Sequence, residues 1–120
     1  MKASSAVLEV TPARAIQSLQ DGLGFSDEEL AAALGVTPRS LKSWRAGTTH
    51  PQQLARQRLT ELLRLQQRVA ETFEGASAIR EWLHRESRYL GGLTPADAIR
   101  VGRLDRAEAA LEALDSGIAL

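Results

Sequence analysis

Cysteine is absent from this chain of 120 residues, and so are long apolar runs. Without cysteine the chain can form neither a disulfide nor a thiolate zinc site, which fits a reducing cytosol. No apolar run approaches the roughly 18 residues that a membrane-spanning helix needs. The first ten residues carry one lysine and a short apolar run that Glu9 interrupts, which is too little for a signal peptide. We therefore expect a cytoplasmic protein with no membrane partner.

A net charge is lacking too, because fifteen Lys and Arg residues balance fifteen Asp and Glu residues. This balance argues against a protein that coats nucleic acid indiscriminately. The charges are unevenly distributed, however. Seven basic residues and one acid lie between Thr37 and Arg68, whereas six arginines and eight acids lie between Phe73 and Leu120. One basic face on a mildly acidic remainder is expected of a module that meets phosphates on one side only.

Convincing strand patterns and internal repeats are also missing, and apolar residues recur at helical spacing. The predicted fold class is therefore all-α. We place helices at about residues 11–20 (ended by Gly22), 26–35, 37–46, 52–72, 78–86, 95–101 and 104–115. A composition shift at Glu74–Ser77 suggests a division into a loose arm (1–10), a module with a long last helix (11–73) and a C-terminal module (74–120). Trp44 and Trp82 are expected as core anchors.

The stretch from Ser26 to Ala46 reads as two short helices joined by a tight turn. Ser26 and Glu29 have the spacing of a capping box, and Gly35 can adopt the left-handed conformation that ends a helix. Thr37-Pro38 then begins a second helix, because proline at the first helical position sacrifices no hydrogen bond. This arrangement resembles the helix-turn-helix of bacterial repressors, although a plain helical corner is the simpler alternative.

A DNA-binding role would fall on the outward side of that second helix. In a repressor-like docking its first turns enter the major groove, where an arginine can pair with guanine through two hydrogen bonds. The alternative is an ordinary solvated basic face. The candidate DNA-binding residues are Thr37, Pro38, Arg39, Ser40, Lys42, Ser43 and Arg45.

An ordered series of motifs covers most of the chain. The C-terminal half contains Trp82-Leu83, Leu90-Gly91-Gly92, Thr94-Pro95, Gly102, Leu111 and Gly117, and the N-terminal half contains Pro38-Arg39-Ser40, Trp44, Ala46-Gly47, Pro51-Gln52 and Gln57-Arg58-Leu59. Together these motifs resemble the Xre/MbcA/ParS antitoxins, in which an Xre-like helix-turn-helix precedes a small helical toxin-binding domain. The chain departs from the common pattern at Ser87-Arg88, where many members carry a proline–asparagine pair.

The resemblance implies a type II antitoxin whose partner is a RES-domain toxin that degrades NAD. The C-terminal domain is expected to neutralise the toxin, and the helix-turn-helix to repress the antitoxin's own operon by binding operator DNA as a homodimer or within a larger assembly with toxin. The last helix and the chain end are the candidate toxin-binding surface, but the end can also fold back on its own core or fray. The candidate toxin-binding residues are Leu111, Leu114, Gly117, Ile118, Ala119 and Leu120.

No combination of residues suggests catalysis or a cofactor. His50 and His84 lie in different modules with no obvious acidic partner. The acids Asp27–Glu29 more simply oppose the dipole of a helix N-terminus than bind a metal. We therefore predict no enzyme activity, no metal and no cofactor. Two other functions stay open: a stand-alone dimeric transcriptional regulator, and a toxin inhibitor that does not bind DNA.

Overall fold

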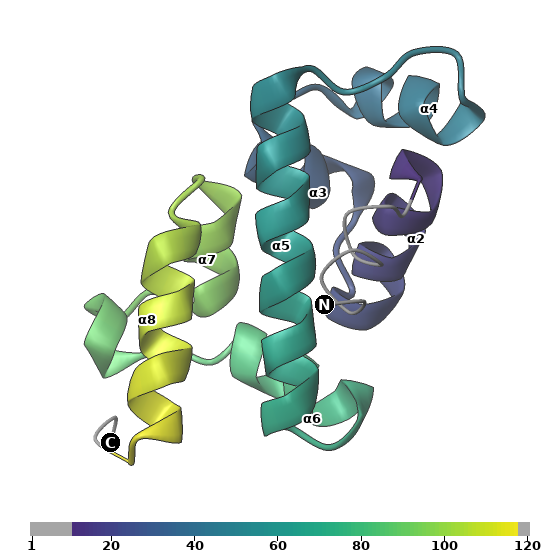
Figure 1. Ribbon diagram of the computed structural model, residues 1–120. Coiled ribbons are helices and arrows are strands. Elements are labelled where there is room, and N and C mark those ends of the chain that lie inside the picture. The colour runs from purple at the N-terminus through teal and green to yellow at the C-terminus, as the bar shows by residue number, and fades with distance from the viewer. Residues whose placement is uncertain (1–10, 118–120) are drawn as a thin grey trace.

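The structure is a computed structural model that describes residues 11–117, and within these residues it is built from helices without strands (Figure 1). This confirms the all-α prediction. The α-helices are α2 (Pro12–Leu23), α3 (Asp27–Leu34), α4 (Pro38–Ala46), α5 (Gln53–Thr72), α6 (Gly75–Leu83), α7 (Pro95–Arg100) and α8 (Leu104–Asp115), and a short 3-10 helix, η1, spans Arg88–Leu90. No described helix is long and apolar enough to cross a membrane.

Side-chain caps explain where four of these helices begin. Thr11, Ser26, Thr37 and Thr94 each accept a hydrogen bond from the backbone N–H three residues later. The predicted capping box is present, because Ser26 Oγ accepts from the Glu29 N–H at 3.1 Å and Glu29 Oε1 accepts from the Ser26 N–H at 2.9 Å. Each such cap stabilises a helix by about 1 kcal/mol.

The first helix is longer than expected, since it continues through Gly22 to Leu23, and Gly24, with a φ of 73°, caps its end. Gly22 lies inside the helix, and Gln66 of α5 approaches it closely. A Cβ on Gly22 would lie 2.0 Å from Gln66 Nε2. The same amide group donates to the Ser18 carbonyl oxygen at 2.9 Å. A polar residue of α5 therefore joins α5 to α2 at the point where glycine leaves room.

Helix α6 begins at Gly75 and ends at Leu83, whereas the sequence placed it at about 78–86. Glu74, the N-cap residue that precedes the helix, makes no side-chain capping bond, so no local signal marks the start of the helix. The shift places Ile79 and Leu83 in the core. Trp82 is only half-buried, against the expectation of a core anchor, whereas Trp44 is 6% exposed as expected.

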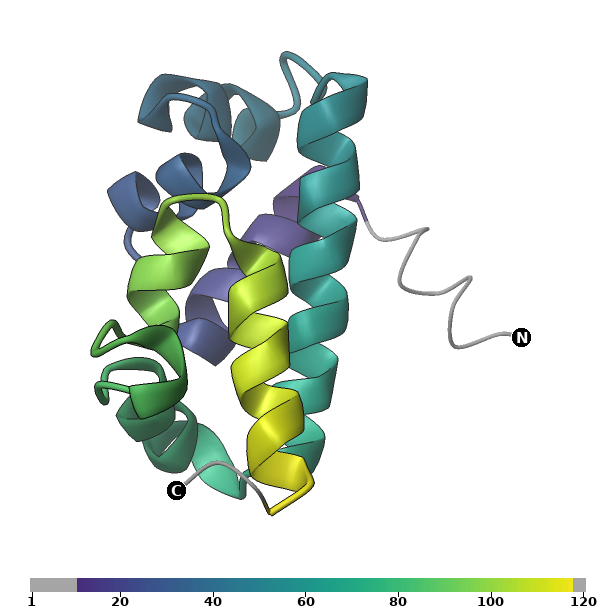
Figure 2. The same cartoon turned by 90° about the vertical axis from the view of Figure 1, so that its left-hand side faces the viewer.

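Helix α5 runs along the length of the molecule (Figures 1 and 2), and in the view of Figure 1 it lies between α2, α3 and α4 on the right and α7 and α8 on the left. Apolar side chains from both halves form one continuous core cluster. It contains Ile16 of α2, Leu62 and Leu65 of α5, Ile99 of α7 and Leu111 of α8. Among the described residues this core holds no buried polar or charged side chain. Burial of apolar surface therefore joins the two halves of the chain.

Polar contacts reinforce the junction of α5 with α8. Arg68 Nη2 lies 2.9 Å from Glu112 Oε1 and 3.8 Å from Asp115 Oδ2. Thr72 Oγ1 donates to Asp115 Oδ1 at 3.2 Å. Part of the basic excess between Thr37 and Arg68 is therefore used inside the molecule, since Arg68 is paired with acids of the C-terminal half.

Candidate functional site

The turn between α3 and α4 is tight, as the sequence predicted, and a side chain of α5 contacts it. Gly35 has a φ of 73°, and its N–H donates to the carbonyl oxygens of Ala31 and Ala32. Arg58 Nη1 donates to the Leu34 carbonyl oxygen at 3.3 Å, and a Cβ on Gly35 would lie 2.2 Å from the same nitrogen. Glycine is favoured here for its left-handed backbone conformation, and a larger residue would also require the end of the Arg58 side chain to move.

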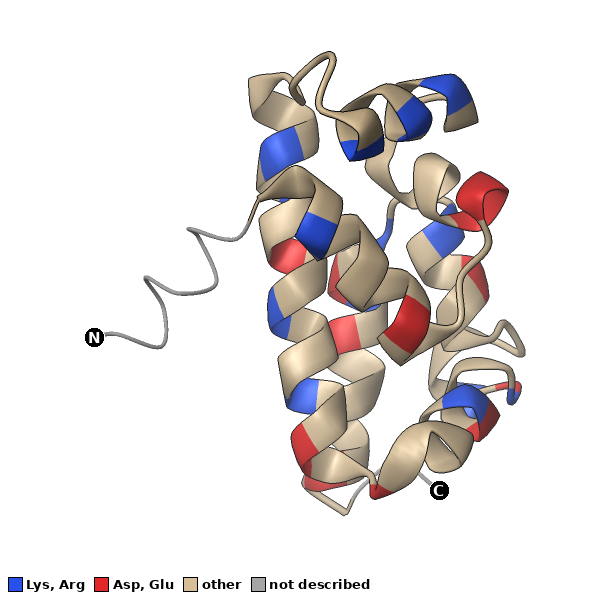
Figure 3. Ribbon diagram, turned by 90° about the vertical axis from the view of Figure 1, so that its right-hand side faces the viewer, with Lys and Arg blue, Asp and Glu red and all other residues tan. Residues whose placement is uncertain are grey.

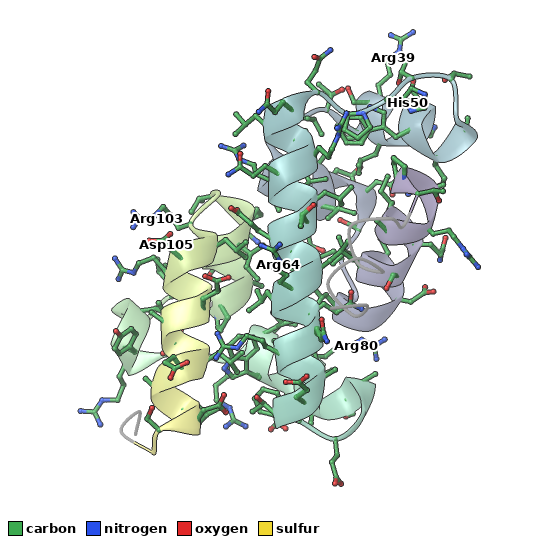
Figure 4. The ribbon with its side chains drawn as sticks, viewed as in Figure 1. Arg39, His50, Arg64, Arg80, Arg103 and Asp105 are labelled. Atoms are coloured by element: carbon green, nitrogen blue, oxygen red, sulfur yellow. The ribbon has the colours of Figure 1, made fainter. Side chains whose placement is uncertain are left out.

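Helix α4 has one buried side and one exposed side. Leu41 and Trp44 are buried in the core. Arg39 and Lys42 are exposed and Ser43 is half-buried, at the i, i+3 and i+4 spacing of one helical face. Basic residues mark this end of the molecule in Figure 3, and Arg39 points away from the body in Figure 4. Ala46, which sequence reasoning left out, is exposed one turn further along the same face.

The hydroxyl groups of Thr37 and Ser40 are engaged at the start of α4. Thr37 Oγ1 accepts from the Ser40 N–H at 3.1 Å, and the two hydroxyl oxygens lie 3.2 Å apart. Pro38, which has no backbone N–H, is exposed beside them. Thr37 and Ser40 therefore use their hydroxyl groups to cap the start of α4. The charged groups of Arg39 and Lys42 remain the most accessible polar groups on the exposed side of α4.

The sequence suggested that the Arg45 side chain faces outward, but in the structure it is paired with residues of α2 and α3. Its Nη2 lies 3.0 Å from Asp27 Oδ1 and donates to Gln20 Oε1 at 2.8 Å, while Gln20 Nε2 donates to Asp27 Oδ1 at 2.7 Å. The hydrogen bonds from Arg45 and then Gln20 lower the pKa of Asp27, because they stabilise the carboxylate. This triad, Gln20–Asp27–Arg45, joins α4 to α2 and α3 and fixes the orientation of α4.

A groove of about 400 Å³ opens at the opposite end of the molecule, among the end of α5, α6, the segment 85–89, and α7 and α8. The Phe73 and Trp82 rings form part of its wall, with centroids 5.7 Å apart and planes inclined at 35°. The other lining residues are Ala78, Glu81, Arg85, Glu86, Ser87, Arg88, Tyr89, Pro95, Ala110 and Leu114. Sequence reasoning missed this groove, because its residues come from five separate segments.

The candidate toxin-binding residues are placed differently from one another. Leu111 is fully buried in the core, so its assignment to a contact surface is corrected to a supporting role beneath α8. Leu114 is 38% exposed and lines the groove. Gly117 is exposed just beyond α8. Ile118, Ala119 and Leu120 lie outside the described residues. Ser87-Arg88, the departure from the family pattern, lies on the groove wall.

The described residues show no cluster of three or more His, Asp or Glu side chains that could hold a metal ion. The carboxylate of Asp27, one of the three acids considered at the sequence level, is engaged by Arg45 and Gln20. Among the arginines outside α4, Arg64 lies on α5, and Arg103 lies just before α8, with its Nη2 3.0 Å from Asp105 Oδ2 (Figure 4).

Comparison with known proteins covers both halves. Residues 3–66 match the antitoxin Xre-like helix-turn-helix domain, and residues 68–117 match the antitoxin Xre/MbcA/ParS C-terminal toxin-binding domain. The mycobacterial cidal antitoxin MbcA of Mycobacterium tuberculosis is 34% identical over 96 residues, which is 80% of this chain and 84% of that protein. A probable mycobacterial cidal antitoxin of the same species is 27% identical over 115 residues, covering 92% of this chain and 97% of that protein.

A solved structure agrees with these relatives. The crystal structure of the M. tuberculosis MbcT–MbcA toxin–antitoxin complex contains a chain that matches with a TM-score of 0.68 and 30% identity, over 90% of this chain and 96% of that one. The two domain matches follow one another along the sequence and correspond to the two halves that α5 joins. The chain therefore belongs to the Xre/MbcA/ParS family of antitoxins.

Proposed function

We propose that this antitoxin neutralises a RES-domain, NAD-degrading toxin through its C-terminal half and represses its own operon through α3 and α4. The observation that carries the proposal is the order of the two domain matches, a helix-turn-helix at 3–66 followed by a toxin-binding domain at 68–117. The similarity to a chain of the MbcT–MbcA complex supports a toxin of the MbcT kind.

The geometry of α4 supports the DNA-binding part of this function. Arg39 and Lys42 project from the side opposite Leu41 and Trp44, and α4 contains no acidic residue that would repel phosphates. In this proposal the Arg39 guanidinium reads a base edge and the Lys42 ammonium contacts the phosphate backbone. Arg45 orients the helix through the Gln20–Asp27–Arg45 triad. Because one such helix covers a short site, we expect a homodimer that reads two half-sites.

The test of the toxin-binding part is to produce the antitoxin together with a RES-domain toxin encoded beside it. We expect the two proteins to co-purify, and the toxin's NAD consumption to be blocked in the complex. Light scattering of the antitoxin, alone and in the complex, gives the oligomeric state. A toxin that remains fully active in the presence of excess antitoxin would contradict the proposal.

The test of the DNA-binding part is a gel-shift titration with the promoter of the same operon. Arg39→Ala should weaken binding by about 1–3 kcal/mol, because it removes a contact to a base edge. The matched control is Arg64→Ala, since Arg64 is an exposed arginine on α5 rather than on α4 (Figure 4). Equal affinity of the wild type and Arg39→Ala would remove Arg39 from the reading role.

A toxin inhibitor that does not bind DNA is the second candidate. It is favoured by the engagement of Arg45 with Asp27, which leaves Arg39 and Lys42 as the unpaired basic side chains of α4 among the described residues. Two cations on one helix form a small basic surface for phosphates. Under this alternative the wild-type protein would not shift the promoter in the gel titration, even at low salt, where contacts to phosphates are strongest.

A further inference from the structure

The groove at the end of α5 exposes large apolar side chains. Tyr89 is 52% exposed and Leu114 is 38% exposed, and both line the groove. Behind them Trp82 is half-buried against Phe73. Partly exposed aromatic side chains gathered in a concave site are characteristic of the central anchor of a protein interface.

Charged side chains border this apolar surface. Glu81 and Arg85 form an ion pair one helical turn apart on α6. Glu86 and Arg88 line the groove without forming an ion pair with any other described residue. An apolar centre with a mixed polar border fits an apolar protein segment better than a strongly charged ligand.

The position of the groove indicates its occupant. All of its lining residues fall within 68–117, the segment that matches the toxin-binding domain. The side of α8 that faces α5 is already occupied, since Leu111 is buried and Glu112 binds Arg68. Leu114 lies on the side that remains, at the groove. A partner that approaches α8 from the side of Leu114 therefore meets the groove at the same time.

We infer that this groove is the anchor site for the toxin and receives an apolar side chain that the toxin presents from a helix or loop. In this inference the Trp82 and Phe73 rings of the groove wall contact the inserted side chain on one side, and Tyr89 and Leu114 enclose it. The inference deepens the proposed function, because it takes the toxin as the partner, and it assigns the main contact to α6 and the 85–89 segment in addition to the last helix.

The test uses the full-length antitoxin and purified RES-domain toxin in a calorimetric titration. Leu114→Glu and Tyr89→Ala, made separately, should each raise the Kd for toxin by at least about 30-fold, as loss of an interface anchor does. The matched control is Val101→Glu, because Val101 is an apolar residue of the same half, 68% exposed and outside the groove. It should change the Kd by less than about threefold, as surface substitutions generally do. Circular dichroism melting confirms that each variant is folded.

The outcomes separate the anchor site from the proposed function. If the wild type binds the toxin and both groove variants bind it with the same Kd, the anchor site is overturned. The proposed antitoxin function would still stand. An equal loss in Val101→Glu would overturn it too, because the effect would then not depend on the groove. A wild-type chain that does not bind the toxin would refute the proposed function, and the anchor site with it.

Photo-crosslinking gives an independent measurement in the complex. A benzoylphenylalanine at position 89 should cross-link to the toxin, and the same probe at position 101 should not. A cross-link from position 89 to residues 118–120 of the same chain, or to a second antitoxin copy, would show a different occupant and would overturn the inference.

Discussion

At the scale of single residues, Arg45 shows how a basic side chain on a recognition helix can serve the protein before it serves a ligand. The sequence places it beside Arg39 and Lys42 in the candidate DNA-binding set. In the structure its guanidinium instead binds Asp27, and Gln20 completes the triad. These partners lie 18 and 25 residues away along the chain, so no local pattern indicates the pairing.

Asp27→Asn is predicted to destabilise the protein by about 0.5–1 kcal/mol at neutral pH, the upper part of the range for partly exposed ion pairs. The pKa of Asp27 is lowered in the folded state. Its stabilising contribution is therefore complete above the unfolded value of about 3.9 and is lost as the pH falls through the lower folded value. Thermal unfolding of wild type and variant should converge in acid. Glu28→Gln, an exposed neighbour in the same helical turn, is the control.

At the scale of elements, the sequence predicts the starts of most helices within one residue, including α5 and α8, which have no side-chain cap. Thr11, Ser26, Thr37 and Thr94 mark four helix starts within one residue. Helix α6 has no capping side chain, and its position was misjudged by about three residues. The sequence does not predict the groove, because its apolar lining joins Phe73 and Trp82 to Tyr89 and Leu114 from other segments of the chain. Local chemistry predicts helices, whereas a concave site depends on tertiary packing.

A comparison of Gly35 with Gly47 can measure how much the approach of Arg58 to the α3–α4 turn contributes to stability. Gly35 and Gly47 both end helices with positive φ, of 73° and 79°. A Cβ on Gly35 would meet Arg58, whereas a Cβ on Gly47 would have nothing within 4 Å. Gly47→Ala should cost about 1–2 kcal/mol for the left-handed backbone alone.

Gly35→Ala should cost more than Gly47→Ala, because Arg58 must also release the Leu34 carbonyl oxygen. The free energies of unfolding in urea give the comparison. Equal losses would mean that Arg58 moves aside without cost.

The expectation that 11–73 and 74–120 form separate modules remains a prediction. The same unfolding curves test it, because separate modules can unfold in two transitions.

At the scale of the whole molecule, the candidate DNA-binding face and the groove lie at opposite ends of α5 (Figure 1). Helix α5 has twenty residues and is therefore about 30 Å long. A toxin seated in the groove thus leaves Arg39 and Lys42 open to DNA. We predict that promoter DNA, antitoxin and toxin form a ternary complex, seen as a further gel shift when toxin is added. Release of the DNA by stoichiometric toxin would contradict this arrangement.

The shared core has a consequence for the lifetime of the protein in the cell. Side chains of α2, α5, α7 and α8 belong to one hydrophobic cluster, so neither half can be opened without exposing the interior of the other. A protease that attacks an opened chain would then remove both halves in a single event. Under the proposed function, each molecule degraded ends inhibition of the toxin and repression of the operon together. Degradation of the antitoxin would in this way restart its own synthesis.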